Sequence, residues 1–203
     1  LPGAVVAALL LPYTGKLTDK FQPTTIIFAG QFIFIVSAFA LADADVNTVF
    51  WVIAFYLMIG RLGIALTSPC VNSAALAALP PEKVNTGAGI VNLSLMLGGT
   101  IGISFFAVVL ERRIQLHGEA LTATQNAAND ATRALIGEVH RVLGTEGIPG
   151  AAHDTLAYKY LGDVVEAQAN TLGFQDGFIW CALAAAVTLI PATILSFQKQ
   201  RRR

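Results

Sequence analysis

One charged residue, Arg61, lies deep within a long apolar run, and three amides, Gln31, Asn72 and Asn92, lie in other apolar stretches. A guanidinium among apolar side chains is costly unless it meets a partner or a water-filled cavity. Arg61 is therefore expected either to line a cavity, where it contacts a substrate or an acid, or to form a structural ion pair. The amides either line the same cavity or join helices by hydrogen bonds. The residues leave both alternatives open.

A second polar group lies in the short segment 15–21, GKLTDKF, between two apolar runs. Gly15 permits a tight turn. Asp19 stands just before the next apolar run, where a carboxylate faces the positive end of a helix, and Lys16 and Lys20 flank it. These charges either form ion pairs that change between states of a gate or simply hold a short turn outside the membrane.

Other chemistry finds little support in the residue types. The sequence has no nucleophile–base pair and no phosphate-binding loop, so we expect no enzyme and no cofactor. His117, His140 and His153 are too widely spaced for one metal site, and His117 has no evident chemical role. Cys70 and Cys181 lie in apolar runs and are interpreted as small buried side chains.

The composition narrows the class further. Of the 203 residues, 55% are hydrophobic and 13% are charged, and the mean hydropathy is +0.63. Soluble domains carry about 25% charged residues, so a soluble enzyme is disfavoured. A net charge of zero argues against nucleic-acid binding. Charges are sparse up to residue 111 and dense over residues 112–172.

The apolar runs predict an all-α polytopic membrane protein in a lipid bilayer. None shows the alternation of a barrel strand, so each is expected to be a helix. The first run is too short to cross a bilayer, which takes about 20 residues, and is interpreted as a truncated span. The chain is thus expected to be the C-terminal part of a longer protein. The five predicted spans are about 1–13, 24–42, 48–79, 84–111 and 176–197.

Residues 112–175 form a polar segment before the last span. Its apolar residues have helical spacing over 119–143 and again after Asp154, and Gly144, Gly147, Pro149 and Gly150 interrupt the pattern. We therefore expect two amphipathic helices, the second leading into the last span. Within the fourth span, Gly98 and Gly102 are spaced for close helix packing.

Basic residues predict the orientation. The loops 14–23 and 80–83 and the basic tail 198–203 carry lysine or arginine, and an even number of spans separates them. All three are assigned to the cytoplasm, as is the C-terminus. The loop 43–47 and the segment 112–175 are assigned to the outside.

Three stretches in order resemble a known family. Residues 15–21 resemble the cytoplasmic loop motif of the major facilitator superfamily, although Gln22 and Thr24 depart from it. Arg61 to Ser104 is similar to the penultimate helix pair of the fourteen-helix drug:proton antiporters of the EmrB/QacA type, with Leu95 where a polar residue is common. Residues 110–122 and 166–178 resemble the outer loop of that branch.

The resemblance implies the last five of fourteen helices of an inner-membrane efflux transporter. It implies proton-coupled export of drugs or other small amphipathic molecules by alternating access, with Gly15, Lys16, Asp19 and Lys20 at the cytoplasmic gate. No acid lies in the middle of a predicted span, so a proton carrier is expected elsewhere. A periplasmic membrane-fusion adaptor is a further implied partner, with 119–170 as its docking surface.

Two other functions remain open at this point. The same fold carries exporters of metabolites or siderophores, and fold does not determine cargo. A membrane scaffold or sensor that binds without transporting is the second alternative. The sequence does not identify the substrate, the stoichiometry or the oligomeric state.

Overall fold

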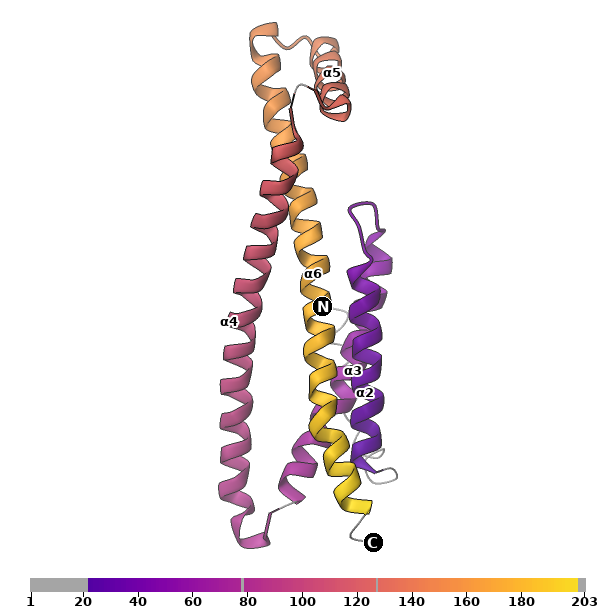
Figure 1. The fold of residues 1–203 in the computed structure, drawn as a ribbon, viewed down its shortest axis with the longest axis vertical. Coiled ribbons are helices and arrows are strands. Elements are labelled where there is room, and N and C mark those ends of the chain that lie inside the picture. The colour runs from indigo at the N-terminus through magenta and orange to yellow at the C-terminus, as the bar shows by residue number, and fades with distance from the viewer. Residues whose placement is uncertain (1–21, 78, 127, 201–203) are drawn as a thin grey trace. The chain divides into compact units, whose positions relative to one another are not determined.

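The computed structural model describes the backbone of residues 22–77, 79–126 and 128–200, and side chains through Thr193. Every regular element in these residues is helical, which confirms the predicted fold class. The elements are α2 (Pro23–Ala42), α3 (Phe50–Ala77), the 3-10 turn η1 (Pro81–Lys83), α4 (Val84–Thr124), α5 (Asp130–Thr145), the 3-10 turn η2 (Gly150–Ala152) and α6 (His153–Gln200) (Figure 1).

Four helical stretches in the described residues are long and apolar enough to cross a membrane. They are α2, α3, η1 with α4, and η2 with α6 through Thr193, and they correspond to four of the five predicted spans. The predicted span 1–13 lies outside the described residues. Large apolar side chains on these helices are exposed, including Trp51 and Ile103 at 75% and 73%. Such surfaces suit lipid or further helices.

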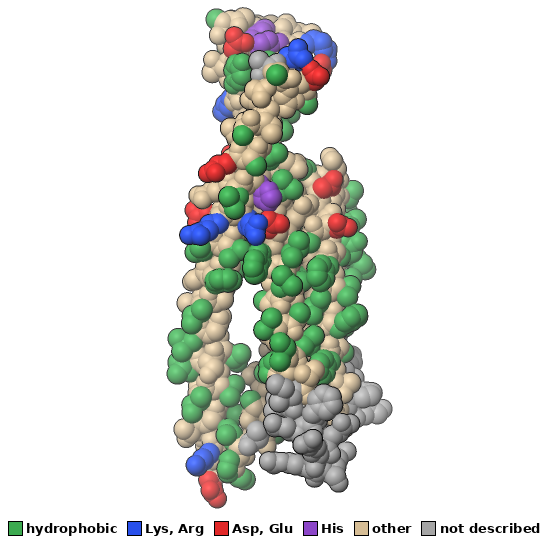
Figure 2. Space-filling view, viewed as in Figure 1, with side chains coloured by type: hydrophobic (Ala, Val, Ile, Leu, Met, Phe, Trp, Pro, Cys, Tyr) green, Lys and Arg blue, Asp and Glu red, His purple; other side chains and the backbone are tan. Residues whose placement is uncertain are grey.

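Two helices extend beyond the apolar runs that predicted them. Helix α4 does not end at residue 111 but continues to Thr124, and α6 begins at His153, well before residue 176. At about 1.5 Å per residue, α4 is about 60 Å long and α6 about 70 Å, roughly twice a hydrocarbon core of about 30 Å. The ends of a helix and the ends of its apolar stretch are therefore different residues. In Figure 2, apolar side chains cover much of the helical surface, and most charged groups lie in clusters.

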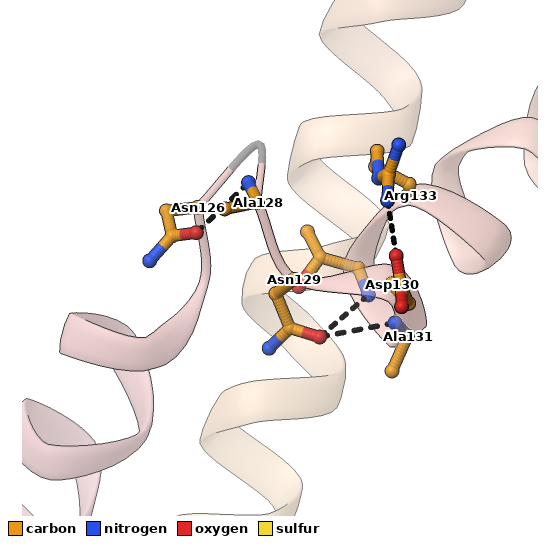
Figure 3. A network of polar contacts seen from close by, with 7 residues as sticks. Asn126, Ala128, Asn129, Asp130, Ala131 and Arg133 are labelled. Atoms are coloured by element: carbon orange, nitrogen blue, oxygen red, sulfur yellow. Dashed lines mark hydrogen bonds and ion pairs between the residues drawn. The ribbon is translucent and has the colours of Figure 1, made fainter.

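The predicted helix over 119–143 is not continuous, because a turn separates the end of α4 from α5, which begins at Asp130. The side chain of Asn129 accepts hydrogen bonds from the backbone N–H groups of Ala131 (3.0 Å) and Thr132 (3.4 Å), which makes it the N-cap of α5 (Figure 3). The Asn126 side chain accepts another from the N–H of Ala128 at 2.9 Å. Asparagine satisfies the free N–H groups of a first turn, so it favours a new helix start over continuation.

The predicted interruption after residue 143 is confirmed. Gly147 has a φ of 72°, a left-handed conformation that glycine adopts without strain. Its N–H donates to the carbonyl of Gly144 at 3.3 Å, and the N–H of Ile148 donates to the carbonyl of Leu143 at 3.1 Å. This pair of bonds is a Schellman motif and terminates α5.

The chain divides into two compact units. We call the described residues through Ala107 and from Gly177 the apolar unit, and Val108–Asp176 the polar unit. Each change of unit falls inside a continuous helix, α4 or α6.

Within the apolar unit, α2 and α3 pack closely through glycines. A Cβ at Gly63 would lie 2.8 Å from the backbone nitrogen of Phe34, and one at Gly60 would lie 2.8 Å from Oγ of Ser37. A Cβ at Gly30 would come similarly close to Oγ1 of Thr67 and to the carbonyl oxygen of Gly63. Ser37 also donates a hydrogen bond to the carbonyl of Tyr56 at 2.6 Å. Because glycine has no side chain, the two helix backbones can approach closely. The resulting dispersion contacts stabilise the pair in lipid, where no hydrophobic effect drives helices together.

Candidate functional site

A cavity of about 440 Å³ lies among the helices of the apolar unit. This volume falls within the range of small-molecule sites, about 300–1,000 Å³. Helix α3 supplies the largest share of its wall, and α2, α4 and α6 supply the rest. The lining residues are Gln31, Phe34, Gly63, Ile64, Thr67, Ser68, Val71, Asn72, Leu95, Cys181, Ala184, Ala185 and Thr188.

Polar groups are few in this wall and belong to three helices. Gln31 on α2 donates from Nε2 to Oγ1 of Thr188 on α6 at 3.0 Å, and Thr188 donates in turn to the carbonyl of Ala185 at 2.7 Å. Thr67 donates to the carbonyl of Gly63 at 2.9 Å. Ser68 and Asn72 make no hydrogen bond within the described part of the chain, so their polar atoms remain available to a ligand.

The cavity brings together some of the predicted residues and leaves others out. Gln31 and Asn72 line it, whereas Arg61 and Asn92 do not. Arg61 lies seven and eleven residues before Ser68 and Asn72, so it shares their stripe of α3. Arg61 is exposed and has no ion-pair partner among the residues described. Asn92 is also exposed, about one turn before Leu95 on α4.

The remaining predicted residues have two different outcomes. Gly15, Lys16, Asp19 and Lys20 lie outside the described residues, so the gate stays a prediction. A Cβ at Gly98 or Gly102 would meet nothing within 4 Å, so no described helix packs on this pair. The close glycine contacts lie instead at Gly30, Gly60 and Gly63. The spacing of Gly60 and Gly63, one turn apart on α3, was the sequence signal for that contact.

The polar unit contains a charged cluster that sequence reasoning missed. His117 on α4 lies 2.9 Å, Nε2 to Oδ2, from Asp176 on α6, and Nη1 of Arg113 lies 3.7 Å from the same carboxylate oxygen. Their side chains are partly exposed, between 28% and 42%. Arg113 and His117 are four residues apart and so share a helix face, which predicts a common acidic partner. The partner could not be identified because it is 59 residues away.

A second histidine pair joins α5 to the start of α6. Nε2 of His140 lies 3.2 Å from Oδ1 of Asp154, without the alignment of a hydrogen bond. The rings of His140 and His153 are 5.7 Å apart, and Nε2 of His153 lies 2.9 Å from the carbonyl oxygen of Ile148. No group of three or more His, Cys, Asp or Glu side chains in the described residues is arranged to hold a metal ion.

Comparisons with known proteins identify a family. The profile of the Major Facilitator Superfamily matches residues 1–108. The uncharacterized MFS-type transporter YhcA of Bacillus subtilis (strain 168) is 24% identical over 196 residues, which are 96% of this chain and 37% of that protein. No solved structure matches the chain.

Two further relatives have more informative names. The lincomycin resistance protein LmrB of Listeria monocytogenes is 27% identical over 54% of this chain and 23% of its own length. The riboflavin transporter RibZ of Clostridioides difficile is 30% identical over 60% of this chain and 28% of its own length. The chain thus spans about a quarter to a third of the length of the relatives that it matches.

Proposed function

Because the chain belongs to the major facilitator superfamily, we propose that it is part of a transporter that exports small amphipathic molecules across the cell membrane by alternating access. The chain itself is a multi-pass membrane protein of apolar helices. The observation that carries the proposal is the cavity of the apolar unit, where apolar walls surround a few polar groups. Such a lining binds an apolar molecule and orients it by one or two hydrogen bonds.

The relatives support small organic molecules as cargo. One is named for lincomycin resistance and supports drug export. Another is named as a riboflavin transporter and favours a metabolite as the second candidate cargo. A cargo panel that contains drugs and vitamins separates the two, because only a transported compound accumulates.

We propose protons as the coupling ion, on the resemblance to drug:proton antiporters. The apolar stretches of the four described spans contain no Asp or Glu, so the proton carrier would lie elsewhere in the protein. In inverted vesicles, an imposed pH gradient should drive cargo accumulation, and an ionophore that collapses the gradient should abolish it. Accumulation that persists without the gradient contradicts proton coupling, and a complete lack of transport favours the scaffold or sensor.

Two amides provide a matched test of the cavity. Asn72 lines the cavity and has no partner in the described residues, whereas Asn92 lies outside it. One hydrogen bond contributes about 0.5–1.5 kcal/mol, so Asn72→Leu should raise KM about two- to tenfold. Asn92→Leu should leave KM unchanged. Equal effects of the two substitutions would mean that this cavity does not bind the cargo.

The gate and the orientation can be tested in the same cells. If Asp19 belongs to a cytoplasmic gate, Asp19→Asn should lower efflux without lowering expression, and full drug resistance in that variant contradicts the role.

Single cysteines introduced after residue 198 should react with a membrane-impermeant thiol reagent only in inverted vesicles if the C-terminus is cytoplasmic.

The polar segment remains the proposed docking surface for a membrane-fusion adaptor. Deletion of residues 119–170 should then impair export from intact cells with two membranes while leaving uptake into inverted vesicles intact. Full efflux from such cells after the deletion would contradict adaptor docking.

A further inference from the structure

The polar unit contains a second and larger cavity, of about 860 Å³, that the transport proposal does not use. The end of α4, helix α5 and the first turns of α6 line it on one side while it opens to solvent on the other, and all of its lining residues belong to the polar unit. Its size matches sites for drug-sized molecules, about 300–1,000 Å³. It is therefore a candidate binding site in its own right.

The wall of this cavity is largely apolar. Ile114 of α4, Ile136 of α5, and Leu161 and Val165 of α6 line it from three helices. Gly137 and Gly162 also line it, and a Cβ at either position would meet nothing within 4 Å. The space beside these two glycines is thus open to a ligand, which could lie directly against the helix backbone.

Most polar side chains on the α4 and α5 side of the cavity, including its one charged group, already have partners. Thr132 is buried and donates to Oε1 of Gln125 at 2.6 Å, and Nε2 of Gln125 donates to the carbonyl of Leu121 at 3.2 Å. The guanidinium of Arg133 forms an ion pair with Asp130 at the start of α5 (Figure 3). The positive charge in the lining is therefore neutralised within the protein.

The polar groups on the α6 side have no such partners. Tyr158 and Glu166 line the cavity at its solvent-exposed rim, and neither makes a hydrogen bond or ion pair with any described residue. They are eight residues apart, with Gly162 midway, so both lie on the face of α6 that borders the cavity. An unneutralised carboxylate attracts a cation, and a tyrosine ring also attracts one through its face.

From this asymmetry we propose that the cavity of the polar unit binds an amphipathic organic cation. Its apolar body lies between Ile114, Ile136 and Leu161, and its positive charge lies at Glu166. The site is separate from the cavity of the apolar unit, so it does not depend on whether the cation is transported.

Equilibrium dialysis of radiolabelled tetraphenylphosphonium against the purified protein in lipid nanodiscs measures this binding, with empty nanodiscs as the blank. Glu166→Gln should raise the dissociation constant about two- to fivefold, the scale of one ion pair at an exposed carboxylate. Gly162→Leu should raise the dissociation constant to a similar degree, because the leucine side chain would fill the cavity. A Cβ at this position would meet nothing within 4 Å, so the substitution should not disturb the helix packing. Asp163→Asn, next to Gly162 but outside the lining, removes the same charge and should change nothing.

Two further measurements locate the site and test the role of charge. Asn72→Leu in the other cavity should not alter the dissociation constant, and an aryl-azide derivative of the phosphonium should label peptides within residues 114–169. A neutral tetraphenyl analogue should bind at least several-fold more weakly. Equal binding of the neutral analogue, labelling confined to other peptides, or equal effects of Glu166→Gln and Asp163→Asn would overturn the proposal.

Discussion

Helices α2 and α3 meet at glycines in the apolar unit, whereas ion pairs also join α4 to α6 in the polar unit. Gly30, Gly60 and Gly63 bring backbone against backbone, and a hydrogen bond from Ser37 to the carbonyl of Tyr56 also joins the two helices. In the polar unit, the Asp176 carboxylate forms ion pairs with both Arg113 and His117. Lipid offers helices no hydrophobic gain on association, so close packing has to supply the stability.

Glycines within the apolar unit also differ among themselves. Those of α2 and α3 are buried in contacts, while Gly98 and Gly102 of α4 face open space in the described structure. Residue type and spacing alone therefore do not identify a packing face. A partner at the right distance is also needed, and it is a property of the whole fold.

The largest effect is expected from Gly63→Leu. The new side chain would meet backbone atoms of Phe34 and Gly30, which cannot rotate away. Overpacking costs about 1–3 kcal/mol, and we expect the upper end of that range here. Unfolding of the purified protein in mixed micelles, followed by tryptophan fluorescence, measures the loss.

Gly98→Leu is the matched control, because nothing lies within 4 Å of a Cβ there. It should change the unfolding midpoint little. If Gly63→Leu fails to express, Gly63→Ala should still show a smaller loss of stability. Equal losses at Gly63 and Gly98 would contradict the contrast between the two faces.

A smaller effect is expected from Gly173→Leu in the polar unit. A Cβ at Gly173 would lie 3.2 Å from the backbone nitrogen of Ile114, so α4 and α6 would have to separate. The cost should be about 1–2 kcal/mol, because overpacking at one contact is partly relieved by local movement. Amide hydrogen exchange near Ile114 should become faster, while Gly137→Leu, at an open position, should leave it unchanged.

Asp176→Asn tests the charged cluster, and its expected loss of stability is smaller than that of Gly173→Leu. Removing the negative charge weakens the contacts with both His117 and Arg113, which are partly exposed, so we expect a loss of about 0.5–1 kcal/mol. A double-mutant cycle with His117→Ala isolates the coupling of that pair. Strictly additive losses would show that Asp176 and His117 do not stabilise one another.

The smallest effect belongs to the loop between α2 and α3. The hydroxyl of Thr48 donates to Oδ1 of Asp45 at 2.7 Å and holds the pKa of this exposed carboxyl below its ordinary value of 3.8. A lowered folded-state pKa stabilises the turn above the ordinary value, and that contribution disappears as the pH falls through the folded-state pKa. Protection of the Asn47 amide, measured against its intrinsic exchange rate at each pH, should fall in that range, and Asp45→Asn should remove this pH dependence.

Part of the candidate site could be predicted from the sequence. Gln31 and Asn72 were recognisable as amides in apolar runs, and both line the cavity. Arg61 and Asn92 satisfied the same rule but lie outside it, because an apolar run shows neither where along a helix nor on which of its faces a cavity lies. Asp176 and Glu166 gave no local signal, since their significance depends on residues contributed by other helices.

The sequence by itself determined the class of this protein. Long apolar runs and few charges dictate membrane-length helices, because backbone groups in lipid must be satisfied within the helix. The tertiary structure alone decided which glycines pack, which amides share a cavity and which acid faces His117. These are contacts between residues far apart in the chain, and their distances depend on how whole helices pack.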